Sequence, residues 1–268
     1  MYPNREVFPS TPLALVAVEA RFADTAKLRQ QSVLDVFAMH LDESLPVVHP
    51  VQDILIETSS QGASAGPPAP GLLLRNLDNT WAVTARPHQL IIETTAYETF
   101  DGLVAVVDKV SAALESAGVS PILERIGLRY IDEIRVPTAV DDVREWQDWI
   151  DNKLIRQSHL LSEDLVATNT QGSVSYLLGD DRFLNVRYAA LNQEPVISHR
   201  HLSRTQFAPG PFFVLDFDGF EMFGTDNQKR YSAQIMRDAL EAVHGPSGEA
   251  FQNALTQKTR ELFRKETT

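Results

Sequence analysis

The stretch ILERIGLRYIDEIRV, residues 122–136, decides the fold, because no other run in the chain is so long, so strand-like and so mixed in charge. At the two-residue period of a β-strand, its side chains divide into two sets. One set is apolar and belongs against a core: Ile122, Ile126, Leu128, Tyr130, Ile134 and Val136. The other set is largely charged: Arg125, Gly127, Arg129, Ile131, Glu133 and Arg135. The division predicts a sheet that helices cover on one face and leave open on the other.

A second stretch near the start of the chain, LALVAVEARF at Leu13–Phe22, repeats this pattern. Its apolar face holds Val16, Val18 and Phe22, and its opposite face holds Glu19 and Arg21. We therefore predict that the two stretches are neighbouring strands. Glu19 and Arg21 would then lie beside the arginines of the central strand on one open face.

The remaining elements of residues 1–119 follow from helical spacing, strand-like runs and the turn residues between them. We predict a helix from Asp24 to about Leu41, a short strand at Asp53–Thr58, a small-residue loop at Ser59–Gly71, strands at Leu72–Leu77, Trp81–Arg86 and Gln89–Tyr97, and a helix from Thr99 to about Ala117. Turns are expected at Asp78-Asn79 and Pro87-His88, and Gly118 is placed to stop the second helix. This half therefore runs strand, helix, about four strands, helix.

The same order restarts in residues 120–268. After the central strand we predict an inward-facing helix at Asp141–Ile155, strands at Leu165–Thr170, Ser173–Leu178, Arg182–Leu191 and Phe212–Met222, and helices at Lys229–Val243 and Gly248–Arg264 with a break at Gly245-Pro246. Gly179-Asp180-Asp181 is a hairpin turn signal. The prediction is an α+β fold, a curved antiparallel sheet with helices on one face, built from two strand–helix–meander–helix halves related by a pseudo-twofold axis and packed as one unit.

Composition excludes several classes of function. A chain of 268 residues, 43% of them hydrophobic, can bury a full core, and its net charge of -12 argues against an extended nucleic-acid surface. The chain has no cysteine, which excludes disulfides, cysteine-bound zinc, iron–sulfur clusters and thiol nucleophiles. No apolar run approaches the roughly 18 residues of a membrane span, and MYPNREVFPSTP lacks the pattern of a secretory signal. We therefore expect a cytoplasmic protein without a membrane partner.

Three short motifs carry a family resemblance. They are Glu19-Ala20-Arg21-Phe22, the run from Arg125 to Ile134, and the C-terminal set Phe251, Thr256, Lys258, Arg260, Leu262 and Phe263. The chain resembles a sporadically distributed family of uncharacterised bacterial proteins, whose central strand has the form RIGLRYIN-R-I. At the Asn and the following Arg of that form, this chain has Asp132 and Glu133. The resemblance implies a bacterial, cytoplasmic protein without an assigned activity, and such a patchy distribution is typical of accessory or defence genes.

Two groups of residues have the types that metal or acid–base chemistry needs. Asp216 and Asp218 in FVLDFDGF alternate so as to share a strand face, where paired carboxylates could bind Mg²⁺, or could be a solvated face. The run His199-Arg200-His201 could hold a metal or phosphate, or could point into water. The chain shows no phosphate-binding glycine loop and no Gly-x-Ser-x-Gly elbow. No cofactor is therefore predicted, with Mg²⁺ reserved for the alternative below.

The charged side chains of the open face are the candidate site: Glu19, Arg21, Arg125, Arg129, Glu133 and Arg135. Guanidinium groups suit carboxylate or phosphate ligands, but these arginines could instead form an ion-pair ladder within the sheet. The two interpretations are compatible if the ladder forms the wall of a groove. The leading hypothesis is a non-enzymatic binding or regulatory protein whose partner is a protein or an acidic small ligand. The alternative is a metal-dependent enzyme that uses Asp216 and Asp218 on a phosphorylated ligand.

Overall fold

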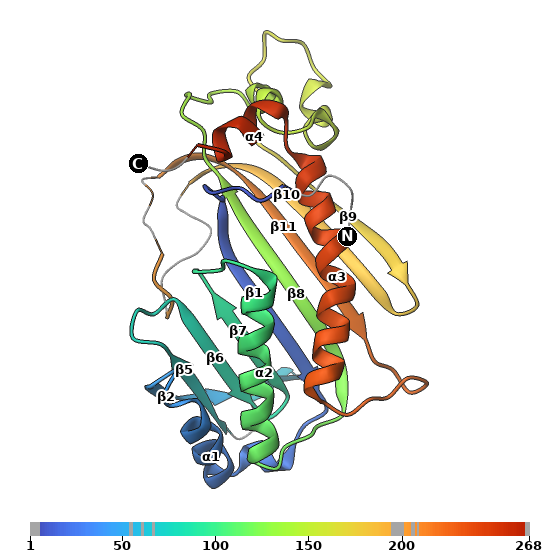
Figure 1. Cartoon of the computed structure of the whole chain (residues 1–268). Helices are drawn as coiled ribbons and strands as arrows, with labels where there is room; N and C mark the ends of the chain where they lie inside the picture. Colours follow the sequence, from blue (N-terminus) through green and yellow to red (C-terminus); the bar gives the residue numbers. More distant parts are fainter. Residues whose placement is uncertain are drawn as a thin grey trace.

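The fold is a single large antiparallel sheet with two long helices on one face (Figure 1). The computed structural model describes residues 6–53, 56–59, 62–65, 68–193, 201–204, 207 and 209–265. Within these residues the sheet has nine strands in the order β2-β5-β6-β7-β1-β8-β11-β10-β9. Its strands are β1 Leu13–Phe22, β2 Val47–Asp53, β5 Ala69–Arg75, β6 Trp81–Arg86, β7 Gln89–Thr94, β8 Leu123–Ile134, β9 Thr170–Gly179, β10 Arg182–Gln193 and β11 Gly210–Met222. The predicted α+β class and antiparallel sheet are confirmed.

The two leading strands lie side by side at the centre of the sheet, as predicted. β1 pairs with β8 so that Ala17 lies opposite Arg129 and Val18 opposite Leu128. Along β1, burial alternates residue by residue over most of the strand, because every second side chain faces the core. The core lies between the sheet and helices α2 (Phe100–Ser116) and α3 (Ala233–Ala254), both of which cross the same face in Figure 1.

Local capping signals explain where α2 begins and ends. The Thr99 side chain accepts a hydrogen bond of 3.1 Å from the backbone N–H of Gly102, which satisfies one donor of the first turn. After the helix, Gly118 has a φ of +69°, a left-handed conformation that glycine adopts without steric cost. The predicted helix and its glycine stop are both confirmed.

The C-terminal helices differ from the prediction in where they break. The sequence predicts a break at Gly245-Pro246, but α3 continues through Pro246, and the chain leaves the helix only at Leu255 before α4 (Gln257–Phe263). A proline inside a helix removes one hydrogen bond. Here the side chains of Val243 and Ser247, on either side of that proline, are buried and lie against Gly219 of β11, so the helix stays packed on the sheet.

The predicted helix at Asp141–Ile155 is wrong, because three short 3₁₀ segments take its place. They are η2 (Val143–Asp148), η3 (Asn152–Leu154) and η4 (Arg156–His159). Val143, Trp146 and Ile150 still face inward, and Trp146 packs against Phe213 with ring centroids 5.5 Å apart. The strand predicted at Leu165–Thr170 is also absent, since 165–169 are irregular and β9 begins at Thr170.

The first half contains similar local corrections. The helix predicted from Asp24 is a 3₁₀ segment, η1 (Ala26–Arg29), followed by α1 (Gln31–Leu41), because Asp24 pairs with Arg29 instead of capping a helix. The strand predicted at Asp53–Thr58 is divided between β2 and β3 (Ile56–Ser59). The loop predicted at Ser59–Gly71 contains β4 (Gly62–Ala65) and the start of β5.

In the described ranges, none of the helices has both the length and the apolar character needed to cross a membrane.

Candidate functional site

The sheet register brings the predicted charged residues together on the face opposite α2 and α3. On β8, Arg125 lies opposite Arg21 of β1, and Arg129 lies opposite Asp218 of β11. Asp216 lies opposite Arg187 of β10. The sequence predicts charged residues separately on β1, β8 and β11. The pairing of these strands brings those residues together, and β10 adds Arg187.

Carboxylates of the same sheet hold these guanidinium groups. Arg125 donates through Nη1 to Glu19 Oε2 at 2.6 Å and through Nη2 to Asp218 Oδ1 at 2.6 Å. The Arg125 side chain is 13% exposed, so this pair of bonds is shielded from water. Gly127 makes the arrangement possible, because a Cβ at that position would collide with the Arg125 guanidinium. Arg21 extends the row by pairing with Glu19 at 3.0 Å.

Two further arginines, Arg129 of β8 and Arg187 of β10, lie on the same face. Arg129 donates from Nε and Nη2 to the two oxygens of Asp216, both at 2.7 Å. The hydrogen bonds with Asp216 raise the pKa of Arg129 and keep it charged. Arg187 approaches Asp216 at 3.3 Å, and both arginine side chains are 46% exposed. The predicted ion-pair ladder therefore exists, and its outer members face solvent.

A groove of about 240 Å³ lies within the ladder. Its floor is made by the small and apolar side chains of Leu15, Ala17 and Ile91, together with Gly127. Its walls are charged: Glu19, Arg21, Glu93, Arg125, Arg129 and Asp218. The ladder is thus the wall of a concave surface, and we call this surface the open-face groove.

Glu133 and Arg135 do not belong to the open-face groove, which corrects their assignment to a solvent-exposed surface. The described residues of the β10–β11 connection, His201–Arg204 and Phe207, lie over the sheet at this end. Arg204 donates to Glu133 at 2.8 Å, and His201 meets Glu93 at 3.0 Å. The Glu133 side chain is 0% exposed as a result.

Two guanidinium groups meet the buried Glu133 carboxylate, since Arg135 donates to it at 2.8 Å alongside Arg204. Burial alone would raise the pKa of Glu133, but the hydrogen bonds from the two arginines outweigh burial and lower it. Glu133 is therefore a structural anion. Of the predicted His199-Arg200-His201 site, only His201 can be placed, because His199 and Arg200 lie outside the described residues.

The Asp216 and Asp218 carboxylates share a face, as their spacing predicts, but arginines surround them. Both oxygens of Asp216 accept from Arg129, and Asp218 accepts from Arg125. Mg²⁺ would have to displace these guanidinium groups before it could bind. Among the described residues, no cluster of three or more His, Asp or Glu side chains could hold a metal. The pair is thus better suited to positioning arginines than to binding an ion.

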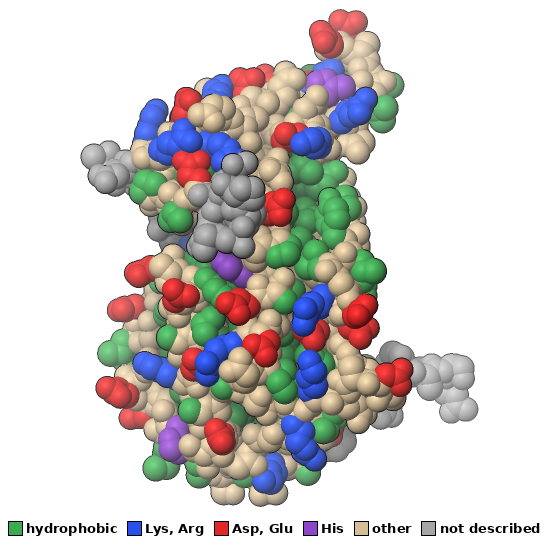
Figure 2. All heavy atoms as spheres, turned by 45° about the vertical axis from the view of Figure 1, so that its right-hand side comes forward, with side chains coloured by type: hydrophobic (Ala, Val, Ile, Leu, Met, Phe, Trp, Pro, Cys, Tyr) green, Lys and Arg blue, Asp and Glu red, His purple; other side chains and the backbone are tan. Residues whose placement is uncertain are grey.

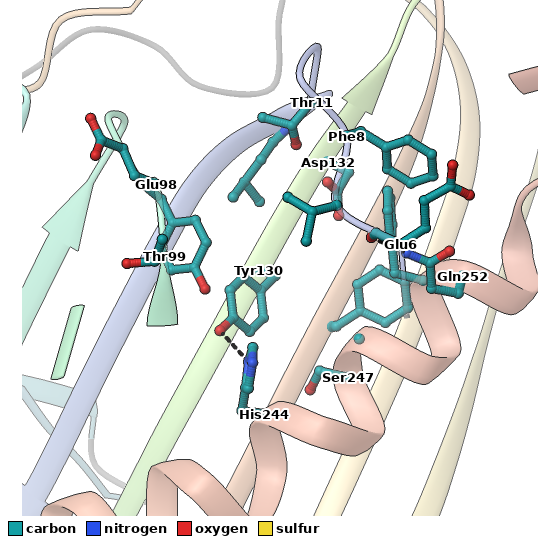
Figure 3. A pocket seen from close by; sticks show the side chains of 16 residues that line it. Glu6, Phe8, Thr11, Glu98, Thr99, Tyr130, Asp132, His244, Ser247 and Gln252 are labelled. Carbon is teal, nitrogen blue, oxygen red and sulfur yellow. Dashed lines mark hydrogen bonds between the residues drawn. The ribbon is translucent and has the colours of Figure 1, made fainter. Parts of the chain in front are cut away.

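A second hollow, of about 210 Å³, lies on the helix-covered face between β8, the start of α2 and the middle of α3 (Figure 3). Tyr130 and Asp132 of β8 reach it from the sheet, and the Tyr130 hydroxyl lies 2.9 Å from Nδ1 of His244 on α3. Burial raises the pKa of Asp132 to about 8. None of the residues predicted from the sequence to form a site lines this hollow. A signal was present, however, because Asp132 is an acid in register with the apolar set of the central strand.

A third hollow, of about 570 Å³, lies between α3 and the edge strand β9. Apolar side chains gather on this part of the surface in Figure 2, and they include the exposed Tyr176 and Leu177 of β9. Its charged side chains, such as Lys153 and Glu249, are exposed at its rim. This hollow therefore has apolar area but no buried charged group that would orient a ligand.

Two adjacent substitutions on β8 test which face carries the ladder. Leu128→Ala is expected to lower the free energy of unfolding by about 2–4 kcal/mol, because Leu128 is fully buried and its loss leaves a cavity. Arg129→Ala is expected to lower it by at most about 1 kcal/mol, because Arg129 is half exposed and Arg187 still faces Asp216. Urea denaturation of both variants measures the difference. Equal losses would contradict the placement of Arg129 on the open face.

No family model, curated protein or solved structure matches this chain at a significant level.

Proposed function

We propose that this protein is a non-enzymatic binding or regulatory protein whose open-face groove takes a protein partner. The observation that carries the proposal is a groove whose apolar floor remains uncovered in the described residues while fixed ion pairs form its walls. Arginines that only stabilise the sheet through ion pairs would not require an apolar groove floor between them. A half-buried apolar strip framed by positioned charges has the composition of a protein interface, in which an apolar centre is surrounded by a polar rim.

The charge balance favours a protein over a small polyanion. Each of the four arginines of this face, Arg21, Arg125, Arg129 and Arg187, lies within 4.0 Å of a carboxylate of the same sheet. A phosphate or dicarboxylate would therefore compete with a fixed carboxylate at each of these arginines. A protein segment with both acidic and basic side chains can instead extend the ladder, with its acids meeting the half-exposed Arg129 and Arg187.

The order of the strands supports a further part of the proposal, namely that the two halves are pseudo-twofold duplicates. From the centre outward, the first half places β1, β7, β6, β5 and β2, and the second half places β8, β11, β10 and β9. Each half thus pairs its leading strand with its last strand before a long helix. The groove would then lie where the two copies meet.

Groove filling tests the proposed function. In affinity capture from a lysate of the source organism, we expect Ala17→Trp to lose a partner protein that the wild type retains, because the new ring fills the groove floor. Met39→Trp is the matched control, since Met39 is 76% exposed on α1 and does not line the groove. For the captured partner, Arg129→Glu should weaken binding by at least about 30-fold through charge reversal in the interface.

Two results would overturn the proposed function. One is a captured protein that the wild type and Ala17→Trp retain equally, since the groove would then play no part in binding. The other is that the purified protein turns over a metabolite and that Ala17→Trp loses none of the proteins that the wild type captures.

A further inference from the structure

The hollow on the helix-covered face contains a buried acidic side chain, Asp132. Asp132 is 4% exposed and lines this hollow, between the N-terminal segment and α3 (Figure 3). In the part of the chain that the structure describes, its carboxylate receives no hydrogen bond. An acid buried without a donor costs free energy, so it calls for an explanation beyond packing.

The other buried polar side chains around the hollow, and Thr99 at its rim, form hydrogen bonds within the protein. Thr99 accepts from Gly102 N, Ser247 donates to Val243 O at 2.8 Å, and Gln252 donates to Glu6 O at 2.8 Å. Tyr130 and His244 bond to each other at 2.9 Å. Asp132 is thus the one polar lining group of the described hollow that is both buried and left to interact with something inside it.

The walls of the hollow suit an organic cation. Aromatic rings from five parts of the chain surround it: Phe8, Tyr97, Tyr130, Phe217 and Phe251. No Lys or Arg is among the described lining residues, whereas Glu6, Glu98 and Asp132 all carry carboxylates. Aromatic faces attract ammonium groups, and a carboxylate in a dry site gives a charged hydrogen bond.

We propose that this hollow binds a small organic ammonium ion, with the ammonium group on the Asp132 carboxylate and an apolar or aromatic body among the surrounding rings. The volume of about 210 Å³ limits the body to about one ring and a short chain, because a cavity of about 150 Å³ takes benzene. The site lies on the opposite face of the sheet from the open-face groove and does not depend on the function proposed for that groove.

The pH dependence of binding follows from Asp132, whose raised pKa of about 8 means that it is mostly protonated at pH 6. A cation binds the ionised form, so apparent affinity should rise by roughly 50-fold between pH 6 and pH 8, as the ionised fraction grows from about 1% to about half. Other titratable or charged groups face Asp132 from the elements around it. They are Glu6 of the N-terminal segment, Tyr97 and Glu98 before α2, Tyr130 of β8, His244 of α3, and Arg204 and Asp216 from the far side of the sheet.

Calorimetric titration with 2-phenylethylamine tests the site, because this amine stays protonated between pH 6 and pH 8. We expect binding that tightens with pH, at least tenfold weaker binding of the neutral isostere 2-phenylethanol at pH 8, and no binding of phenylacetate. Asp132→Asn should lose both the binding and its pH dependence. His244→Gln should keep most of the pH dependence, which separates Asp132 from the nearby imidazole.

The proposal is overturned if the alcohol binds as tightly as the amine at pH 8, since the hollow would then be an apolar site. It is also overturned if Asp132→Asn binds the amine like the wild type, or if the wild type does not bind the amine at millimolar concentration. Thermal denaturation of each variant at pH 6 confirms that loss of binding is not loss of folding. Because Ala17→Trp lies on the other face, it should bind the amine normally, so failure of either proposed site can be told apart from failure of the other.

Discussion

Asp132→Asn is expected to make the protein more stable, by about 4 kcal/mol at pH 7. Burial raises the pKa of Asp132 from 3.8 to about 8, so the folded state holds a proton that the unfolded state has released at neutral pH. Stability from this group is therefore fully present below pH 3.8 and is lost as pH rises toward 8, at about 1.4 kcal/mol per pH unit. Asn cannot ionise and does not lose this stability.

The measurement is urea denaturation of wild type and Asp132→Asn at pH 4, pH 7 and pH 8.5. The two proteins should be nearly equally stable at pH 4, and the gap should grow with pH. Asp226→Asn is the control, since Asp226 is exposed and its replacement should leave stability unchanged across the range. A gap that is constant with pH, or a less stable Asn variant at pH 8.5, would contradict a buried acid at this position.

The layout of the sheet could be predicted because a strand that is buried on one face has an apolar residue at every second position. β1 shows this alternation along its length, and β8 shows it around Leu128 and Arg129, where the pairing of Val18 with Leu128 confirms that the apolar sides match. The segment Val143–His159 could not be predicted in the same way. Trp146 and Ile150 lie at a spacing that fits a helix, but consecutive 3₁₀ turns bury the same residues.

The charged face could be predicted only in part, because its partners are distant in sequence. Arg125 and Arg129 were placed on the open side by alternation alone. That Asp216 and Asp218 would meet those arginines depends on the register of β11 against β8, which strand pattern does not specify. The cover over Glu133 comes from Arg204, 71 residues away, and nothing in the local sequence indicates such a contact.

The hollow with Asp132 was missed for a related reason. The alternation places this residue on the core side, where an acid is most often satisfied by a neighbouring donor. Only the positions of α3 and the N-terminal segment show that the carboxylate faces a cavity instead.

Glu133→Ala is expected to lower the free energy of unfolding by about 3–5 kcal/mol, the opposite of the change at its neighbour. Glu133 is buried between Arg135 and Arg204, whose side chains are 19% and 9% exposed. Removing the carboxylate takes away the anion that these two half-buried guanidinium groups share, which costs more than the ion pair contributes. Arg135 also lies over the Phe212 ring, with 4.9 Å from Cζ to the centroid, so it cannot swing into water without losing that contact.

Glu133→Gln separates charge from shape, because glutamine fills the same space without the charge. The hydrogen bonds from Arg204 and Arg135 lower the pKa of Glu133, so its contribution is present above about pH 4.5 and is lost as pH falls through the lower folded value. Urea denaturation should therefore show Glu133→Gln as less stable than wild type at pH 7, with a gap that narrows below pH 4. Arg204→Ala combined with Glu133→Ala should cost less than the sum of the two single changes, since each removes the same pair. Additive losses, or a gap that does not change with pH, would mean that the carboxylate is not held by these arginines.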